Sequence, residues 1–202
     1  AVKNALVTIT LNDIIEENIF DGNVILSTQA EVDEFGSHNY IGITGYLIIG
    51  YNLGPDYSNI TDLSPLEPLT FVNGEIVISY NEALASLSGL GNLSEIGSSL
   101  GIYANPVLTS LESLNNLTEI NGGLNISFDD SLVDFNGLNN ITKVKNYLTV
   151  QGMMIENLSG LQNITSVGSL NITFNPKLIN IDALSAINSL NGILLIQRNP
   201  LL

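Results

Sequence analysis

The sequence contains no cysteine and no tryptophan, one histidine, and only five basic residues in 202. The absence of cysteine excludes disulfides, thiolate metal ligands and a cysteine nucleophile. Twenty acidic residues give a formal net charge of -15. We therefore expect no nucleic-acid partner, because binding phosphate requires Lys and Arg. No run of 18 apolar residues is long enough to span a bilayer, so we expect no direct membrane insertion.

Catalytic motifs are also lacking. No glycine-rich phosphate loop, zinc spacing or nucleophile with its base can be found. The only histidine, His38, falls in a polar segment (GSHN) that we interpret as a surface loop. The sequence therefore predicts that the protein is not an enzyme.

What the sequence has instead is a repeat of about 24 residues. Short apolar-x-apolar strands follow one another at intervals of 22 to 24 residues, apart from a first interval of 29 that contains an insertion within residues 50–59. A regular period in this range is typical of a solenoid. The predicted strands begin at Leu47, Ile76, Leu100, Leu124, Leu148, Leu170 and Leu194, and Val24 begins an earlier one.

Between the strands, apolar residues recur at every third position. One such arc contains Leu108, Leu111, Leu114, Leu117 and Ile120. This interval does not suit an α-helix, whose apolar stripe follows a period of 3.6, but it suits a chain that bends around a core in short turns. We therefore predict a β-solenoid: a leucine-rich-repeat-like coil over residues 22–202, with about eight rungs and one parallel β-sheet.

The sequence also predicts how each end of this coil is covered. Thr28 and Glu31 have the spacing of a capping box, which predicts a short N-terminal capping helix whose Val32 and Phe35 face the first rung. Residues 1–21 are expected to be an extension or a further cap. At the other end Leu202 follows a strand without its arc, so we expect that the C-terminal cap is missing and that the natural protein continues.

A polar residue follows most strands, where the coil would turn. We interpret this column as structural, with side-chain amides binding the backbone of neighbouring coils. The alternative is a calcium site made by Asp129, Asp130 and Asp134 through oxygen ligands, but Asp134 occupies a position that is polar in every arc. We therefore predict no metal and no cofactor, with calcium as the alternative. The column consists of Asn81, Asn105, Asp129, Asn175 and Asn199.

Strand alternation places the leucines inside and the residues between them outside. The outward strip is nearly uncharged and rich in hydroxyls and amides, which suits a glycan or an extended partner, although any exposed sheet must be polar. The candidate binding residues are Ser79, Tyr103, Asn125, Ser127, Thr149, Gln151, Asn171, Thr173 and Gln197 in the strip, with Tyr51, Asp56 and Tyr57 in the insertion.

The strand pattern Gly-x-Leu-x-Ile, followed by leucines at every third residue, resembles the receptor L-domain family, relatives of leucine-rich-repeat proteins. The segments GGLNI (122–126) and GSLNITFN (168–175) carry it, and residues 24–35 look like the N-terminal cap of bacterial members. The resemblance covers about residues 22–202 and implies a right-handed coil in a secreted or cell-surface protein. Animal receptor members carry disulfides, so the absence of cysteine favours a bacterial version.

We therefore expect a non-catalytic binding or adhesion module that presents a rigid sheet face to a protein or carbohydrate partner. A structural spacer within a longer surface protein is the alternative from another class. An ice-binding solenoid is a third reading, but Tyr103, Gln151 and Leu195 interrupt the regular ranks of small residues that would match an ice lattice. The identity of the ligand and the oligomeric state stay open.

Overall fold

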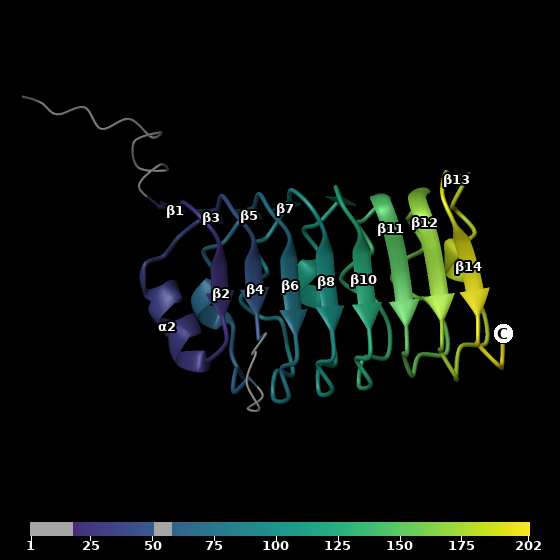
Figure 1. The fold of residues 1–202 in the computed structure, drawn as a ribbon, viewed down its shortest axis with the longest axis horizontal. Helices are drawn as coiled ribbons and strands as arrows, with labels where there is room; N and C mark the ends of the chain where they lie inside the picture. Colours follow the sequence, from purple (N-terminus) through teal and green to yellow (C-terminus); the bar gives the residue numbers. More distant parts are fainter. Residues whose placement is uncertain (1–17, 51–57) are drawn as a thin grey trace, which may run out of the picture.

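The main element of the fold is a parallel β-sheet that runs the length of the molecule (Figure 1). The computed structural model of the protein describes residues 18–50 and 58–202. Strands β9 (Glu119–Ile120) and β13 (Ser189–Leu190) extend the sheet beside the first residues of β11 and β12. The other strands are β2 (Val24–Leu26), β4 (Leu47–Ile49), β6 (Ile76–Ser79), β8 (Leu100–Tyr103), β10 (Leu124–Ser127), β11 (Lys143–Gln151), β12 (Ser166–Thr173) and β14 (Leu194–Gln197).

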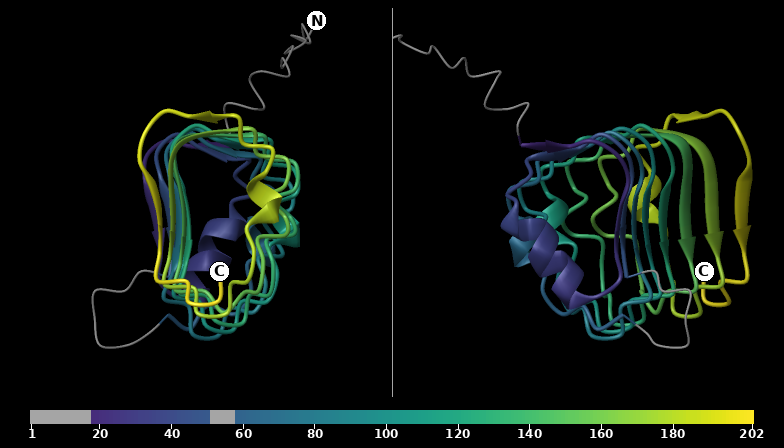
Figure 2. Two further views of the ribbon diagram at one scale, coloured as in Figure 1. Left: turned by 90° about the vertical axis from the view of Figure 1, so that its right-hand side faces the viewer. Right: turned by 60° about the vertical axis from the view of Figure 1, so that its left-hand side comes forward.

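The register of this sheet follows the sequence period. Leu124 of β10 pairs with Leu100 of β8 on one side and with Leu148 of β11 on the other. All three side chains are buried, so equivalent aliphatic residues lie in one interior file. Successive coils superimpose when the molecule is seen along the stack (Figure 2). The prediction of stacked coils that shelter one another's aliphatic side chains is confirmed in this solenoid-like arrangement of parallel strands.

A second parallel sheet, which the sequence analysis did not predict, lies at the end of the arcs. It has four strands in the order β1-β3-β5-β7. Each strand is two residues long, because only the last residues of an arc are extended and lie beside those of the next coil. The strands are β1 (Ile19–Phe20), β3 (Gly42–Ile43), β5 (Phe71–Val72) and β7 (Glu95–Ile96). The expectation of one sheet was therefore incomplete.

The three-residue interval of the arcs has a direct structural cause. Short 3-10 helices form in three arcs: η1 (Ser64–Leu66), η2 (Glu112–Leu114) and η3 (Asp182–Leu184). A 3-10 helix has three residues per turn, so side chains three apart point the same way. In the second of these arcs, Leu111, Leu114 and Leu117 are all buried. The arcs form the wall opposite the main sheet (Figure 2).

One α-helix, α2 (Gln29–Ser37), is present in the described part of the chain, and it covers the end of the stack beside β2 (Figure 1). The predicted capping box is confirmed: the Oγ1 of Thr28 accepts from the backbone N–H of Glu31 at 3.3 Å, and the Oε2 of Glu31 accepts from the N–H of Thr28 at 3.0 Å. Val32 is buried and Phe35 packs against the core. His38 is exposed, as expected for a surface residue; it is the C-cap of this helix, and its ring stacks on Tyr40.

No helix in these residues is long and apolar enough to cross a membrane. Of the predicted N-terminal extension, only residues 18–21 fall in the described part of the chain, and β1 lies there.

Candidate binding surface

The polar column at the end of the strands has a structural role. Asn81, Asn105, Asp129 and Asn175 are completely buried. The Nδ2 of Asn105 donates to the carbonyl of Ile78 in the preceding coil at 3.0 Å. Asn175 repeats this contact with the carbonyl of Val150 at 3.1 Å, and Asn199 with that of Ile172 at 2.9 Å. These hydrogen bonds confirm that the column joins neighbouring coils.

Asp129 is the exception in this column because a carboxyl replaces the amide. Its Oδ1 accepts from the backbone N–H and the Nδ2 of Asn105 at 2.7 and 3.1 Å. Its Oδ2 is buried and has no hydrogen-bond partner. Burial raises the pKa of Asp129 to about 7, against the opposing effect of the Asn105 hydrogen bonds, and the charge of Asp130 raises it further. The carboxyl is therefore an imperfect substitute for the amide.

The other carboxylates proposed for calcium occupy different environments. Asp130 is exposed, whereas the Oδ1 of Asp134 accepts from the N–H of Asn136 at 2.9 Å within a turn. Asp62 makes the same turn in an earlier arc, where hydrogen bonds from the hydroxyl and N–H of Ser64 lower its pKa. Within the described ranges, no group of three or more His, Cys, Asp or Glu residues is placed to hold a metal ion.

The outward strip of the main sheet is only partly exposed. Asn125, Thr149, Gln151, Asn171 and Tyr103 are half-buried, and Gln197 is exposed on β14. The predicted exposure of Ser79, Ser127 and Thr173 is wrong, because all three are buried. Along this row the three small side chains alternate with the larger Tyr103, Gln151 and Gln197. Each small residue is also followed in the chain by an aromatic residue. The small side chains therefore lie below their larger neighbours. Tyr51, Asp56 and Tyr57 lie outside the described residues.

The position directly after each of these strands was not among the candidate binding residues. Its residues all have a left-handed backbone, with φ between 56° and 65°. Bulky residues rarely adopt this conformation, yet three large exposed rings hold it: Tyr80, Phe128 and Phe174. From Tyr80 to Phe174, large and small residues alternate at this position, which is the signal that the sequence offered. In order, the row is Tyr80, Ala104, Phe128, Gly152, Phe174 and Arg198.

A hollow of about 350 Å³ opens on this face. It brings together five of the predicted binding residues and four that were not predicted. The rings of Tyr80 and Tyr103 meet edge to face, with centroids 5.9 Å apart. The hollow is lined by Tyr103, Asn125, Ser127, Thr149 and Gln151, which were predicted, and by Tyr80, Ala104, Phe128 and Tyr147.

Two glycines make room for the rings at this hollow. A side chain at Gly152 would collide with the ring of Phe128, and one at Gly123 would collide with the ring of Tyr147. Both rings therefore lie across a neighbouring coil. Because a glycine has no Cβ, the aromatic side chains can approach the backbone there.

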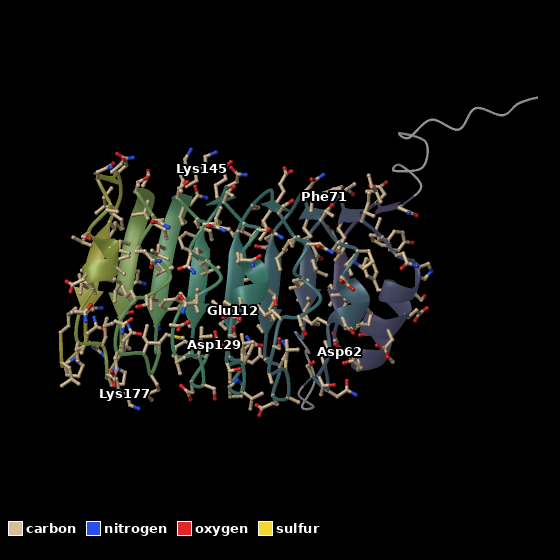
Figure 3. All side chains as sticks on the ribbon, turned by 180° about the vertical axis from the view of Figure 1, so that it is seen from behind. Asp62, Phe71, Glu112, Asp129, Lys145 and Lys177 are labelled. Carbon is tan, nitrogen blue, oxygen red and sulfur yellow. The ribbon has the colours of Figure 1, made fainter. Side chains whose placement is uncertain are left out.

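Among the residues that the structure describes, no charged side chain lines the hollow. All of its lining residues are aromatic, amide, hydroxyl or alanine side chains. Among the basic residues, Lys145 lies at the opposite end of the strands from Asp129 (Figure 3). The guanidinium of Arg198 lies over the ring of Phe174, 4.7 Å from its centroid. The hollow can therefore offer ring faces and uncharged hydrogen-bonding groups, but no ion pairs.

No known family model matches the chain, and no curated protein is similar enough to count as a relative. The resemblance to receptor L-domains accordingly stays a prediction.

Proposed function

We propose that this protein is a non-catalytic binding module that presents the outward face of its main sheet to an extended partner. It acts within a secreted or cell-surface protein, of bacterial type, as the resemblance to receptor L-domains implies. In this proposal the stack is a right-handed, leucine-rich-repeat-like solenoid of about eight rungs.

One observation carries the proposal. Five side chains that strand alternation selected as outward-facing line the same hollow, together with four exposed or half-exposed neighbours. Three of the rings around it, Tyr80, Phe128 and Tyr147, are 45%, 51% and 42% exposed. A rigid parallel sheet below the hollow supports a preformed site, which lowers the conformational cost of binding.

An ice-binding face is less well supported by this geometry, since the large rings and the hollow interrupt the flat surface that lattice matching needs. A spacer segment would have the same stack of coils, but no partner would bind to the outward face of its main sheet. The two functions differ in whether the hollow has a partner, and this can be measured.

The test is a screen of the purified chain against glycan and peptide arrays, repeated with Thr149→Arg. Thr149 lies in the floor of the hollow, so the substitution places a charged, bulky side chain there. We expect a saturable hit with the parent chain and at least a tenfold loss with Thr149→Arg, roughly the effect of one lost favourable contact.

The control is Asn115→Arg, which adds the same charge at the exposed end of η2 on the opposite wall. This variant should keep the hit. A saturable hit that survives Thr149→Arg would place the partner elsewhere, and the absence of any saturable hit would favour the spacer.

A further inference from the structure

We propose that the hollow binds an uncharged, extended carbohydrate chain that lies across the strands, along the stack, with alternate sugar rings on Tyr80 and Phe128. This inference rests on the proposed binding function and specifies the class of its ligand.

The first argument is the presentation of the rings. Tyr80 and Phe128 are 45% and 51% exposed, although each keeps a bulky side chain on a left-handed backbone with φ of 57° and 58°. The conformation recurs throughout the row and belongs to the turn of the coil, but bulky side chains rarely adopt it, so what distinguishes these two positions is an exposed ring. Aromatic faces offered to solvent are suited to the apolar C–H faces of sugar rings.

The second argument is the spacing. Tyr80 and Phe128 occupy equivalent positions after β6 and β10, and Ala104 fills the position after the strand between them. Two steps of the sheet correspond to roughly 10 Å. This is about the length of one disaccharide unit in an extended β-1,4-linked chain. The small side chain of Ala104 leaves space for the intervening sugar between the two rings.

The third argument is the floor of the hollow. Asn125 of β10 and Thr149 and Gln151 of β11 line the hollow and are half-exposed. Amides and hydroxyls supply both donors and acceptors, as sugar hydroxyls require. The hydroxyl of Ser127 donates to the Oδ1 of Asn125 at 3.2 Å, which fixes the orientation of that amide.

The charge of the protein decides against an anionic glycan. Within residues 18–50 and 58–202, no Lys, Arg or His lines the hollow, and the formal net charge is -15. A chain of uronic or sialic acids would meet long-range repulsion without a compensating ion pair. A peptide is also less suitable, because peptide and protein partners gain most from anchors in fully desolvated apolar pockets, and this floor is polar.

The experiment is a calorimetric titration of the full chain with three uncharged β-1,4-linked tetrasaccharides: cellotetraose, mannotetraose and tetra-N-acetylchitotetraose. We expect at least one to bind saturably, and its disaccharide to bind at least about tenfold more weakly, because a disaccharide reaches only one of the two rings. Trigalacturonate, the anionic probe, should not bind.

Tyr80→Ala and Phe128→Ala should each weaken tetrasaccharide binding by about tenfold. Both variants should fold, because Ala104 already occupies this position with a φ of 56°. Tyr80→Phe keeps the ring and should bind within about twofold of the parent. Phe71→Ala removes a ring from the smaller sheet and should leave binding unchanged. Far-UV circular dichroism checks the fold of each variant.

The inference is wrong if none of the three tetrasaccharides binds, if binding survives the loss of both rings, or if trigalacturonate binds as well as they do. A peptide hit that Thr149→Arg abolishes, in the absence of tetrasaccharide binding, would overturn the carbohydrate assignment and leave the binding function intact. If neither a tetrasaccharide nor a peptide bound, both the carbohydrate assignment and the proposed binding function would be wrong.

Discussion

At the scale of single residues, Asp129 shows how a repeat tolerates an imperfect member. Its Oδ1 accepts the two hydrogen bonds from Asn105 that an asparagine oxygen would accept. Its Oδ2 takes the place of an amide nitrogen, which in Asn105 donates to backbone carbonyls. Burial favours the protonated form because it removes the solvation of the charge. Only the protonated form can also donate from this atom.

This difference predicts a dependence of stability on pH. An unfolded Asp titrates near 3.8, whereas folding raises the pKa of Asp129 to about 7. Between these values the folded state binds more protons than the unfolded state, so the free energy of unfolding falls as the pH rises from about 4 to about 7. The loss should amount to a few kcal/mol, at about 1.4 kcal/mol per pKa unit.

Asp129→Asn should remove most of this dependence and should stabilise the protein at about pH 8, since its amide can donate at every pH. Urea unfolding at about pH 5 and about pH 8 measures both effects. Asp130→Asn is the matched control, because Asp130 is exposed and only adds to the shift. A parent protein with equal stability at the two pH values would show that Asp129 is not protonated in the fold.

At the scale of elements, the start of the capping helix is specified by local sequence, whereas the ends of the strands are specified by contacts between coils. Helix α2 begins where a local pattern, Thr28 with Glu31, satisfies the first backbone N–H groups. The strand ends depend on non-local contacts, because most coils turn where an amide or carboxyl of the polar column binds the coil before it. A helix cap can therefore be predicted from a single element, whereas the polar column can be recognised only when several coils are compared.

Thr28→Ala should lower the free energy of unfolding by about 1 kcal/mol, the usual value of a lost N-cap. Thr28→Ser keeps a hydroxyl in the same place and should lose less than half of that. Chemical denaturation of the three proteins gives the comparison. Equal losses in the two variants would mean that the methyl group of Thr28, rather than its hydroxyl, stabilises this end of the stack.

At the scale of the whole molecule, the charge balance should govern the response to salt. A formal net charge of -15 makes the compact state repel itself. Raising sodium chloride from about 0.01 M to about 0.1 M shortens the screening length from about 30 Å to about 10 Å. We therefore expect the melting temperature to rise by a few degrees.

Differential scanning calorimetry measures this shift, and sodium perchlorate at the same ionic strength is the control for specific-ion effects. Screening predicts a rise in both salts. A melting temperature that is constant, or that rises in chloride alone, would contradict the electrostatic explanation.

The sequence by itself determined the coiled architecture of this protein, the register of the strands and the burial of the leucines, except on the last strand, where Leu194 is exposed. It could do so because each coil copies the last, so residues such as Leu100, Leu124 and Leu148 meet their own equivalents. The outward direction of Asn125 and Thr149 followed from the same alternation. The roles of Thr28 and Glu31 followed from local spacing.

Only the tertiary structure decided which outward residues line the hollow. The hollow depends on pairing across coils: the ring of Phe128 lies beside Gly152, and that of Tyr147 beside Gly123. It also depends on the residues at the left-handed position after the strands, where Tyr80 is exposed, whereas Ser127 in the strip is buried. The repeat specifies which positions coincide, whereas side-chain size and backbone conformation at those positions decide whether the surface there is flat or hollow.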